Sequence, residues 1–353
     1  MSKLPDPDFW RDRRVLLTGH TGFKGSWTAL WLQRLGADVT GLALAPDTDP
    51  SLFGLARVAE GMRSHVADIR DREAVTRIVG KAAPDIVLHL AAQPLVRRSL
   101  REPVETVATN VLGTAHLLDA LRGRAGLSAV LVVTSDKVYL NTNSGDPFGE
   151  TDPLGGKDPY SASKAAAEIV TGSFAKSFFD AKGVPVATAR AGNVVGGGDF
   201  SEDRIVPDLV TALRRGEQLV LRHPEAVRPW QHVLDCIAGY LLYAEALATG
   251  ADVPAALNFG PEPSQPVKVA EFATALQEAM EATSGWRHEP VPGSVEAQLL
   301  TLDSSAARRL LDWRDRLPGR ASVDAVAAWY RAWLHGADMA AFTMEQIASY
   351  GKG

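Results

Sequence analysis

Short runs of apolar residues recur along the chain, separated by longer segments in which apolar residues follow a helical spacing. Runs of this length, bounded by glycine or polar residues, predict β-strands. They occupy residues 15–18, 38–44, 65–69, 85–92, 129–133 and 184–190. Because strands alternate with helical segments, we expect right-handed βαβ units. The pattern predicts an α/β fold built on a doubly wound parallel sheet of the Rossmann type, with ligands at the carboxyl ends of the strands.

The pattern changes after residue 190, where a glycine-rich loop is followed by a further series of helical segments. We expect a smaller α/β lobe that binds the substrate to begin there. A helix is predicted from about residue 232 to 249, and the family resemblance given below implies that it packs back on the sheet. The dinucleotide-binding domain would then comprise residues 1–190 and about 232–257, and the substrate lobe about 191–231 and 258–353.

Three glycines follow the first strand at a spacing of three. Gly19, Gly22 and Gly25 lie between that strand and a segment with helical character. Glycines in such a turn let the backbone approach a diphosphate, which the N–H groups of the next helix can bind. This arrangement predicts a dinucleotide site.

The choice between NAD and NADP stays open. An acidic residue at the end of the second strand would select NAD, but none stands there, and Asp47 comes later in a Pro-rich loop. Within the third strand, Asp68 could accept a hydrogen bond from the adenine amino group and Ile69 could cover the ring. Alternatively, Asp68 caps the helix that follows it.

Two stretches of sequence carry candidate catalytic groups. Tyr160 and Lys164 share one face of a helix that opens at Pro159. A neighbouring cation favours an ionised phenol, so we expect the pKa of Tyr160 to fall below its usual value. The second stretch follows the strand that ends at residue 133, where Ser135, Asp136 and Lys137 would face the same crevice. A hydroxyl beside an acid and an amine is typical of proton transfer.

Composition narrows the class of protein. Of the 353 residues, 46% are hydrophobic and 22% are charged, and the net charge is −5, which gives no reason to expect nucleic acid or an anionic membrane as a partner. We find no apolar run of about 18 residues that would span a membrane. With a single cysteine, Cys236, the chain fits a reducing compartment, and we expect a cytoplasmic protein.

Several residues whose side chains could react, bind a metal or stack on a base are predicted to have structural roles instead. Cys236 lies in an apolar run, which favours packing over reactivity. His89 lies within a strand without Cys or His partners at metal spacing, so we expect a core residue and no metal site. Trp329 and Trp333, four residues apart, are typical of helix packing.

Together these motifs resemble the extended short-chain dehydrogenase/reductase family, and the match covers nearly the whole chain. The segments that carry the resemblance are 18–27, 90–97, Ser135 with Tyr160 and Lys164, and 190–199. Within the family the chain is most similar to nucleotide-sugar 4,6-dehydratases of the CDP-sugar branch. The reason is that Asp136 and Lys137 stand where the dTDP-sugar enzymes have an Asp-Glu pair.

The resemblance implies a three-stage reaction of a CDP-hexose. Tyr160, held as phenolate by Lys164 and aligned by Ser135, removes the C4 hydroxyl proton while C4 loses hydride to NAD. Water then leaves across C5 and C6, with Asp136 as the acid and Lys137 as the base, and the hydride returns to C6. The expected setting is deoxysugar biosynthesis of the O-antigen type.

The resemblance also implies binding residues. Those expected at the cofactor are Gly19, Thr21, Gly22, Phe23, Lys24, Gly25, Asp68, Ile69, Leu90, Ala91, Ala92, Asn110, Tyr160 and Lys164. Those expected at the substrate are Gln93, Arg97, Asn193, Arg204 and Arg228, because arginine forks suit phosphate oxygens. Arg204 could equally form a surface salt bridge.

Two other functions remain open at this stage. A nucleotide-sugar 4-epimerase needs Ser135, Tyr160 and Lys164 but has no use for Asp136 and Lys137. A dinucleotide-sensing protein without chemistry would have no use for any of the five. A 4,6-dehydratase for another nucleotide sugar is a further alternative, because the base is inferred from resemblance alone. Family members pair through the helix that carries Tyr160, so we expect a homodimer or homotetramer, with residues 165–167 permitting close helix contact.

Overall fold

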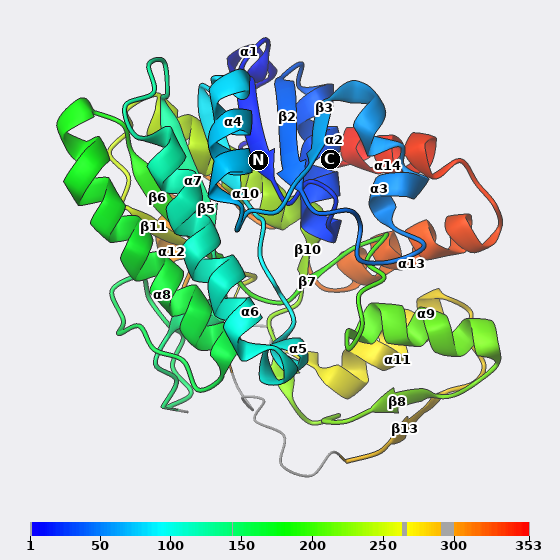
Figure 1. The fold of residues 1–353 in the computed structure, drawn as a ribbon. Helices are drawn as coiled ribbons and strands as arrows, with labels where there is room; N and C mark the ends of the chain where they lie inside the picture. The colour runs from blue at the N-terminus through cyan, green and yellow to red at the C-terminus, as the bar shows by residue number, and fades with distance from the viewer. Residues whose placement is uncertain (1, 143, 263–266, 291–299, 353) are drawn as a thin grey trace.

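A parallel sheet of seven strands runs through the centre of the computed structural model, which describes residues 2–142, 144–262, 267–290 and 300–352 (Figure 1). The strand order is β11-β6-β5-β4-β1-β2-β3, which confirms the predicted doubly wound fold. The strands are β1 Arg14–Thr18, β2 Asp38–Ala43, β3 Arg63–Val66, β4 Ile86–His89, β5 Ala129–Val133, β6 Val186–Ala191 and β11 Ala256–Phe259. Strand order reverses between β1 and β4, and ligands bind at such a switch point.

Both faces of the sheet are covered by helices, which explains why its strands read as continuous apolar runs. In β1, Leu16 packs on one face, whereas Val15 and Leu17 pack on the other. Figure 1 shows α4, α7 and α8 side by side on the first face, with α2 and α10 on the second. These helices are α2 Phe23–Arg34, α4 Arg72–Ala82, α7 Gly113–Leu121, α8 Pro159–Phe174 and α10 Val233–Ala248.

Several element boundaries differ from the sequence prediction, and two of them bear on the site. Strand β3 ends at Val66, so Asp68 and Ile69 lie beyond it and not within it. The sequence of residues 109–114 predicts the start of a helix at Thr109, but this helix begins earlier, with α6 Pro103–Val107, and continues through the π-helical turn η2 Ala108–Leu112 into α7. Pro103 at the first helical positions explains the early start, because proline is favoured there.

The chain returns to the sheet after residue 231, as the family resemblance implied. Helix α10 packs against α2 and β5, and β11 pairs with β6. The last helices, α12 Ser305–Leu311, α13 Arg320–Leu334 and α14 Met339–Tyr350, add buried residues such as Leu311 and Trp329 to the same core cluster. The two-domain division stays a prediction, and residues 263–266 and 291–299 of its second part lie outside the described residues.

A second group of elements lies beyond the carboxyl ends of the strands, at the lower right of Figure 1. Its helices are α9 Ile205–Arg215 and α11 Val269–Ala279, and its short strands are β8 Leu219–Leu221, β9 Val227–Arg228, β12 Val267–Lys268 and β13 Trp286–His288. Helix α5, Val96–Arg101, lies between this group and the sheet. Across the described ranges, we find no helix with the length and apolar character needed to span a bilayer.

Candidate active site

A cleft of about 900 Å³ opens where the chain leaves β1, β4, β5 and β6. Its wall includes Gly19, Leu90, Thr134 and Gly192, each of which closely follows the end of one of these strands. The volume is within the range of cofactor and substrate sites. Every site residue predicted from the sequence lines this cleft, with the exception of Asn110.

The glycine loop packs so closely that side chains would not fit. A Cβ on Gly25 would lie 2.0 Å from the carbonyl oxygen of Gly19, and a Cβ on Gly19 would lie 2.7 Å from the backbone nitrogen of Ala91. Gly22 is the N-cap of α2 and has no side chain that could cap the helix. The first residues of the helix, 23–25, form part of the cleft wall, where their backbone N–H groups are available to a ligand. This cradle fits a dinucleotide diphosphate.

Asp68 lies in the cleft wall and is paired with Arg70. Its carboxylate accepts hydrogen bonds from the Arg70 guanidinium and backbone N–H, and these interactions lower its pKa. The alternative that Asp68 caps the next helix is wrong, because Asp71 is the N-cap of α4 and accepts from Ala74 N at 3.0 Å. Asp68 and Ile69 therefore stay candidates for the adenosine end of the cleft.

The loop after β4 is held by internal hydrogen bonds. Thr18 Oγ1 accepts from the backbone N–H groups of Leu90 and Ala91, at 3.2 and 3.1 Å. Asn110 is 2% exposed, and its amide binds the backbone of Gln93 and the Ser163 hydroxyl. Asn110 thus supports the loop from behind and does not reach the cleft wall.

Gln93 lines the cleft, but its amide is engaged within the protein. It donates to Leu95 O at 3.1 Å and to Thr106 Oγ1 at 2.8 Å, and it accepts from Leu95 N at 2.6 Å. The geometry gives the Gln93 side chain a structural task. Its predicted contact with substrate stays a prediction.

Helix α8 begins as the sequence indicated. Asp158 is the N-cap and accepts from Ser161 N at 2.9 Å, and Pro159 occupies the first turn. Tyr160 and Lys164 are 8% and 7% exposed, and both line the cleft. The pKa of Lys164 is lowered to about 7; burial is the largest cause, the charge of Lys24 acts in the same direction, and Glu168 opposes the change. The protonated and neutral forms of Lys164 are therefore both populated near neutral pH.

Burial also dominates the phenol. It raises the pKa of Tyr160 to about 12, whereas a hydrogen bond with Ser135 and the charge of Arg204 lower it. The expectation of a lowered phenol pKa is wrong for this structure, because lost solvation outweighs the favourable neighbours. The structure does bring Ser135, Tyr160 and Lys164 together in one cleft.

The residues after β5 form a short 3₁₀ turn, η3 Asp136–Val138. Ser135 Oγ donates to Asp136 Oδ1 at 3.0 Å and accepts from Lys137 N at 3.2 Å, so the serine hydroxyl fixes the turn. Asp136 is 2% exposed, and within the described chain its Oδ2 has no hydrogen-bond partner. Lys137 is half-buried and lines the cleft. The turn therefore presents an acid and an amine beside Tyr160.

The predicted substrate residues line the same cleft as the catalytic candidates. Asn193, Arg204 and Arg228 all line the cleft. Arg204 Nε lies 3.7 Å from Asp199 Oδ2, so Arg204 forms the salt bridge that was the alternative to phosphate binding. Both residues of this salt bridge line the cleft. Arg97 Nη1 donates to Asp203 Oδ1 at 2.5 Å.

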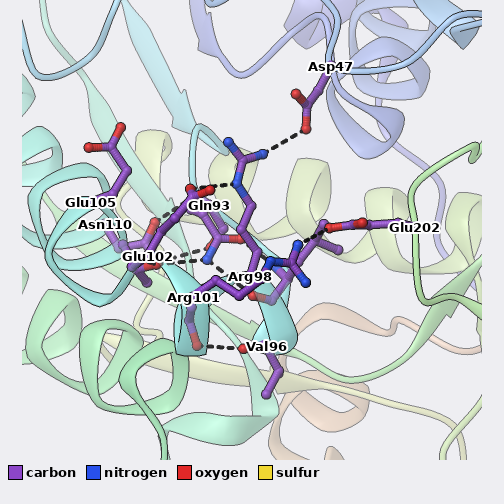
Figure 2. Close-up of polar contacts among 12 residues, drawn as sticks. Asp47, Gln93, Val96, Arg98, Arg101, Glu102, Glu105, Asn110 and Glu202 are labelled. Carbon is purple, nitrogen blue, oxygen red and sulfur yellow. Dashed lines mark hydrogen bonds and ion pairs between the residues drawn. The ribbon is translucent and has the colours of Figure 1, made fainter.

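Helix α5 reaches across the cleft through its arginines. Figure 2 shows Arg98 bound to Asp47, in the loop after β2, and Arg101 bound to Glu202, in the second group of elements. These hydrogen bonds are 2.9 and 2.6 Å long. Asp47, considered above for the cofactor ribose, is therefore engaged by Arg98.

Comparisons with known proteins agree with this geometry. The model of the NAD dependent epimerase/dehydratase family matches residues 15–260. The chain belongs to this family. It is 41% identical over 352 residues to the CDP-glucose 4,6-dehydratase of Salmonella typhimurium, with 98% of each chain covered. It is 30% identical to the dTDP-glucose 4,6-dehydratase of Streptomyces griseus, covering 90% of this chain and 95% of that protein.

Solved structures of the epimerase/dehydratase family share the fold. The UDP-glucose-4-epimerase of Stenotrophomonas maltophila, crystallised with NAD, aligns with a TM-score of 0.80 at 24% identity, covering 92% of this chain and 100% of that one. The resemblance to extended short-chain dehydrogenases/reductases is thus confirmed.

The residues for which the sequence predicts packing roles are buried in the structure. His89 is 2% exposed and lies 2.6 Å from Thr18 Oγ1 and 2.9 Å from Thr114 Oγ1. Among the described residues we find no cluster of His, Cys, Asp and Glu that could hold a metal ion. Cys236 and Trp329 are fully buried, in agreement with packing roles.

Sequence reasoning missed a set of polar residues around the cleft. Asp203, Asp208, Arg222 and His223 line the substrate side, and Arg222 Nη1 donates to Asp203 at 2.6 Å. Burial raises the pKa of Asp208 to about 6. These residues carry no motif, so their position in the chain gave no signal.

Proposed function

We propose that the chain is a CDP-glucose 4,6-dehydratase that uses NAD and converts CDP-D-glucose to CDP-4-keto-6-deoxy-D-glucose. One observation carries the proposal. Asp136 and Lys137 follow Ser135 directly and line the same cleft as Tyr160 and Lys164. A 4-epimerase needs no acid and amine at this place. The identity of 41% over the full length to a CDP-glucose 4,6-dehydratase supports the same reading.

The first stage uses helix α8 and Ser135. Ser135 donates a hydrogen bond to the C4 oxygen of the sugar. Burial keeps the phenol of Tyr160 protonated in the chain alone, so we propose that the positive charge of bound NAD would lower its pKa enough for the phenolate to take the C4 hydroxyl proton. Lys164, on the same helix face, stabilises that phenolate. Bound NAD supplies the hydride acceptor at this stage and the hydride donor at the last.

The second stage uses the turn after β5. The 4-ketone makes the C5 proton acidic, and Lys137 removes it while Asp136 donates a proton to the departing C6 hydroxyl, so that water leaves. Lys137 then returns a proton to C5 as hydride reaches C6. The proton that Tyr160 took from C4 passes through solvent to Asp136, which restores both groups. These assignments are part of the proposal.

Substrate recognition is assigned to polar residues of the second group of elements and of the loops after β4 and β6. Asn193, Arg204 and Arg228 are proposed to bind the pyrophosphate, since arginine forks match phosphate oxygens. Arg97 and Gln93 are proposed near the sugar. The cradle of residues 19–25, together with Asp68 and Ile69, is proposed for NAD. The single buried cysteine agrees with a reducing compartment, and the proposed setting is cytoplasmic deoxysugar biosynthesis for lipopolysaccharide.

We also propose that two copies pair through α6 and α8, as a homodimer or within a homotetramer. The outward face carries Val104, Leu112 and Ile169, which are 80%, 53% and 63% exposed. On α8 this face includes Ala162 and Ala166, whereas Ala165 and Ala167 are buried in their own chain. The close-contact surface of α8 is therefore the row 162, 166 and 169, which follows the helical period.

The substrate is tested by incubating the protein separately with CDP-, dTDP-, UDP- and GDP-glucose and NAD. We expect loss of one water from CDP-glucose, detected by mass spectrometry, and a 4-keto-6-deoxy sugar by NMR. Turnover of dTDP-glucose without turnover of CDP-glucose contradicts the substrate. A 4-epimer that retains the C6 hydroxyl contradicts the reaction class, and binding of NAD without turnover of any sugar nucleotide favours a sensing role.

A further inference from the structure

A buried ion pair lies directly behind the two catalytic elements. Glu168 on α8 and Arg190 on β6 have side chains that are 4% and 6% exposed. Arg190 donates to the carboxylate through Nε at 3.0 Å and through Nη2 at 2.8 Å. Such a fork fixes the relative position of both side chains. The pair thereby joins helix α8 to the sheet.

The same pair holds the start of the turn that carries Asp136 and Lys137. The Thr134 hydroxyl donates to Glu168 Oε1, and the Thr188 hydroxyl donates to Oε2 at 2.7 Å. Glu168 therefore accepts four hydrogen bonds. Thr134 directly precedes Ser135, so the first residue after β5 is tied to the carboxylate.

The pair holds the end of that turn as well. Arg190 Nη1 donates to the Tyr139 hydroxyl at 2.9 Å, and this hydroxyl donates to Asn258 Oδ1 at 2.7 Å. Tyr139 is 2% exposed, and its ring stacks on Phe148 with centroids 4.9 Å apart. Residues 134 and 139 are thus both fixed to one ion pair.

Helix α8, which carries Tyr160 and Lys164, also carries Glu168. Lys164 precedes Glu168 by four residues on α8, and Tyr160 precedes Lys164 by four, so all three lie along one helix face. Proton transfer at C4 depends on Tyr160 and Lys164 of α8, aligned by Ser135 at the start of the turn, whereas elimination depends on Asp136 and Lys137 within the turn. The Glu168 carboxylate therefore contacts the elements that carry both groups of proposed catalytic residues.

We propose that Glu168 and Arg190 are positioning residues that set the distance between the turn 134–139 and helix α8, with Thr134 and Tyr139 as the links to the turn. This inference rests on the proposed function. A buried ion pair by itself is weak evidence for stability, since apolar residues of similar volume often stabilise as well. Its task here is alignment. A misplacement of about 1 Å lowers a rate by about 10²-fold.

The test uses Tyr139→Phe in the full chain, which keeps the ring on Phe148 and removes the link to Arg190. The measurement is the ratio of released 4-keto sugar that still has its C6 hydroxyl to 4-keto-6-deoxy product. We expect this ratio to rise about tenfold, because C4 oxidation continues while the displaced acid and amine slow elimination. A ratio of two products from one active site does not depend on the folded fraction, so a merely structural role leaves it unchanged.

Tyr350→Phe is the matched control. Tyr350 is also buried, at 5% exposed, and donates to Asp235 Oδ1 at 2.8 Å, outside the cleft wall. It should lose stability without changing the product ratio. Thr134→Val should raise the ratio as Tyr139→Phe does, and Thr134→Ser, which keeps the hydroxyl, should restore it. Parent-like ratios in both Tyr139→Phe and Thr134→Val overturn the proposal.

A second measurement is independent of the reaction. Amide hydrogen exchange of a peptide containing residues 134–139 should be about tenfold faster in Tyr139→Phe than in the parent, and a peptide from α8 should stay parent-like. Unchanged exchange in the turn overturns the positioning role whatever the substrate is. If the parent dehydrates none of the four sugar nucleotides, the proposed function fails, and hydrogen exchange still decides the positioning role.

Discussion

Lys164 Nζ donates a hydrogen bond of 3.2 Å to the carbonyl oxygen of Val133, the last residue of β5. The bond joins helix α8 to the strand from which Ser135, Asp136 and Lys137 follow. Because the ammonium is buried, its pKa falls to about 7. At neutral pH the buried ammonium of Lys164 therefore destabilises the folded chain. Such a loss of stability is common where a buried group serves activity.

We expect Lys164→Met to abolish turnover and to raise the melting temperature of the protein without NAD. A lysine whose pKa falls from 10.5 to about 7 on folding opposes folding most below about pH 7, where both states bind the proton. Its effect disappears as the pH rises to the unfolded value. The gain in melting temperature should therefore be largest near about pH 6.5 and narrow towards about pH 10.

Thermal unfolding at both pH values checks this prediction, with Lys176→Met as the control. Lys176 is exposed on the π-helical turn that continues α8, so its removal should produce no such pH-dependent gain. An equal gain for Lys164→Met at both pH values contradicts the linkage.

We expect Lys137→Ala to separate the stages of the reaction. The variant retains Ser135, Tyr160 and Lys164, so C4 oxidation of CDP-glucose should stay detectable as transient absorbance of reduced cofactor. Without the proposed base, exchange of the C5 hydrogen with deuterated solvent should fall by about 10²-fold or more. Mass spectrometry of recovered sugar measures this exchange, and exchange at the parent rate assigns the base to another group.

We expect Gly25→Ala to weaken NAD binding by about tenfold or more. The added Cβ would lie 2.0 Å from the Gly19 carbonyl oxygen, so the loop must move away from its place beside the diphosphate site. Gly172→Ala on α8 is the control, because no atom lies within 4 Å of its added Cβ. It should stabilise the protein by about 0.5–1 kcal/mol. Titration calorimetry with NAD and thermal unfolding distinguish the two effects.

We expect Ile169→Glu to convert the protein to monomers. Ile169 is 63% exposed at the centre of the face proposed for pairing, where a charge would lose its hydration. Val66→Glu is the control, since Val66 is 68% exposed on β3, away from that face. Sedimentation velocity checks both variants. A parent that sediments as a monomer, or a dimer that persists in Ile169→Glu, contradicts the proposed interface.

Several features of the fold could be predicted because their causes are local. Apolar runs between glycines and polar residues located the central strands, and Asp158 with Pro159 located the start of α8. The glycines at 19, 22 and 25 located the cradle before α2. Each of these signals depends on residues close together in the chain, which is why boundaries such as those of β3 and α6 were still misplaced by a few residues.

The electrostatics of the site could not be predicted in the same way. The phenol of Tyr160 was expected to be acidic because a lysine lies four residues away, yet burial raises its pKa to about 12. Desolvation depends on the whole fold around the helix start. Asn110 likewise seemed a cofactor residue, and only packing shows that its amide is engaged by Gln93 and Ser163.

The sequence by itself determined the sheet and the glycine cradle, and it located the proposed catalytic set Ser135, Tyr160 and Lys164, because these follow from periodicity and motif spacing. Only the tertiary structure decided what surrounds that set. Glu168 and Arg190 are 22 residues apart, and Tyr139 and Asn258 are 119 apart, so no local pattern could reveal that they meet. Long-range packing joins them, and with them the two elements that carry the chemistry.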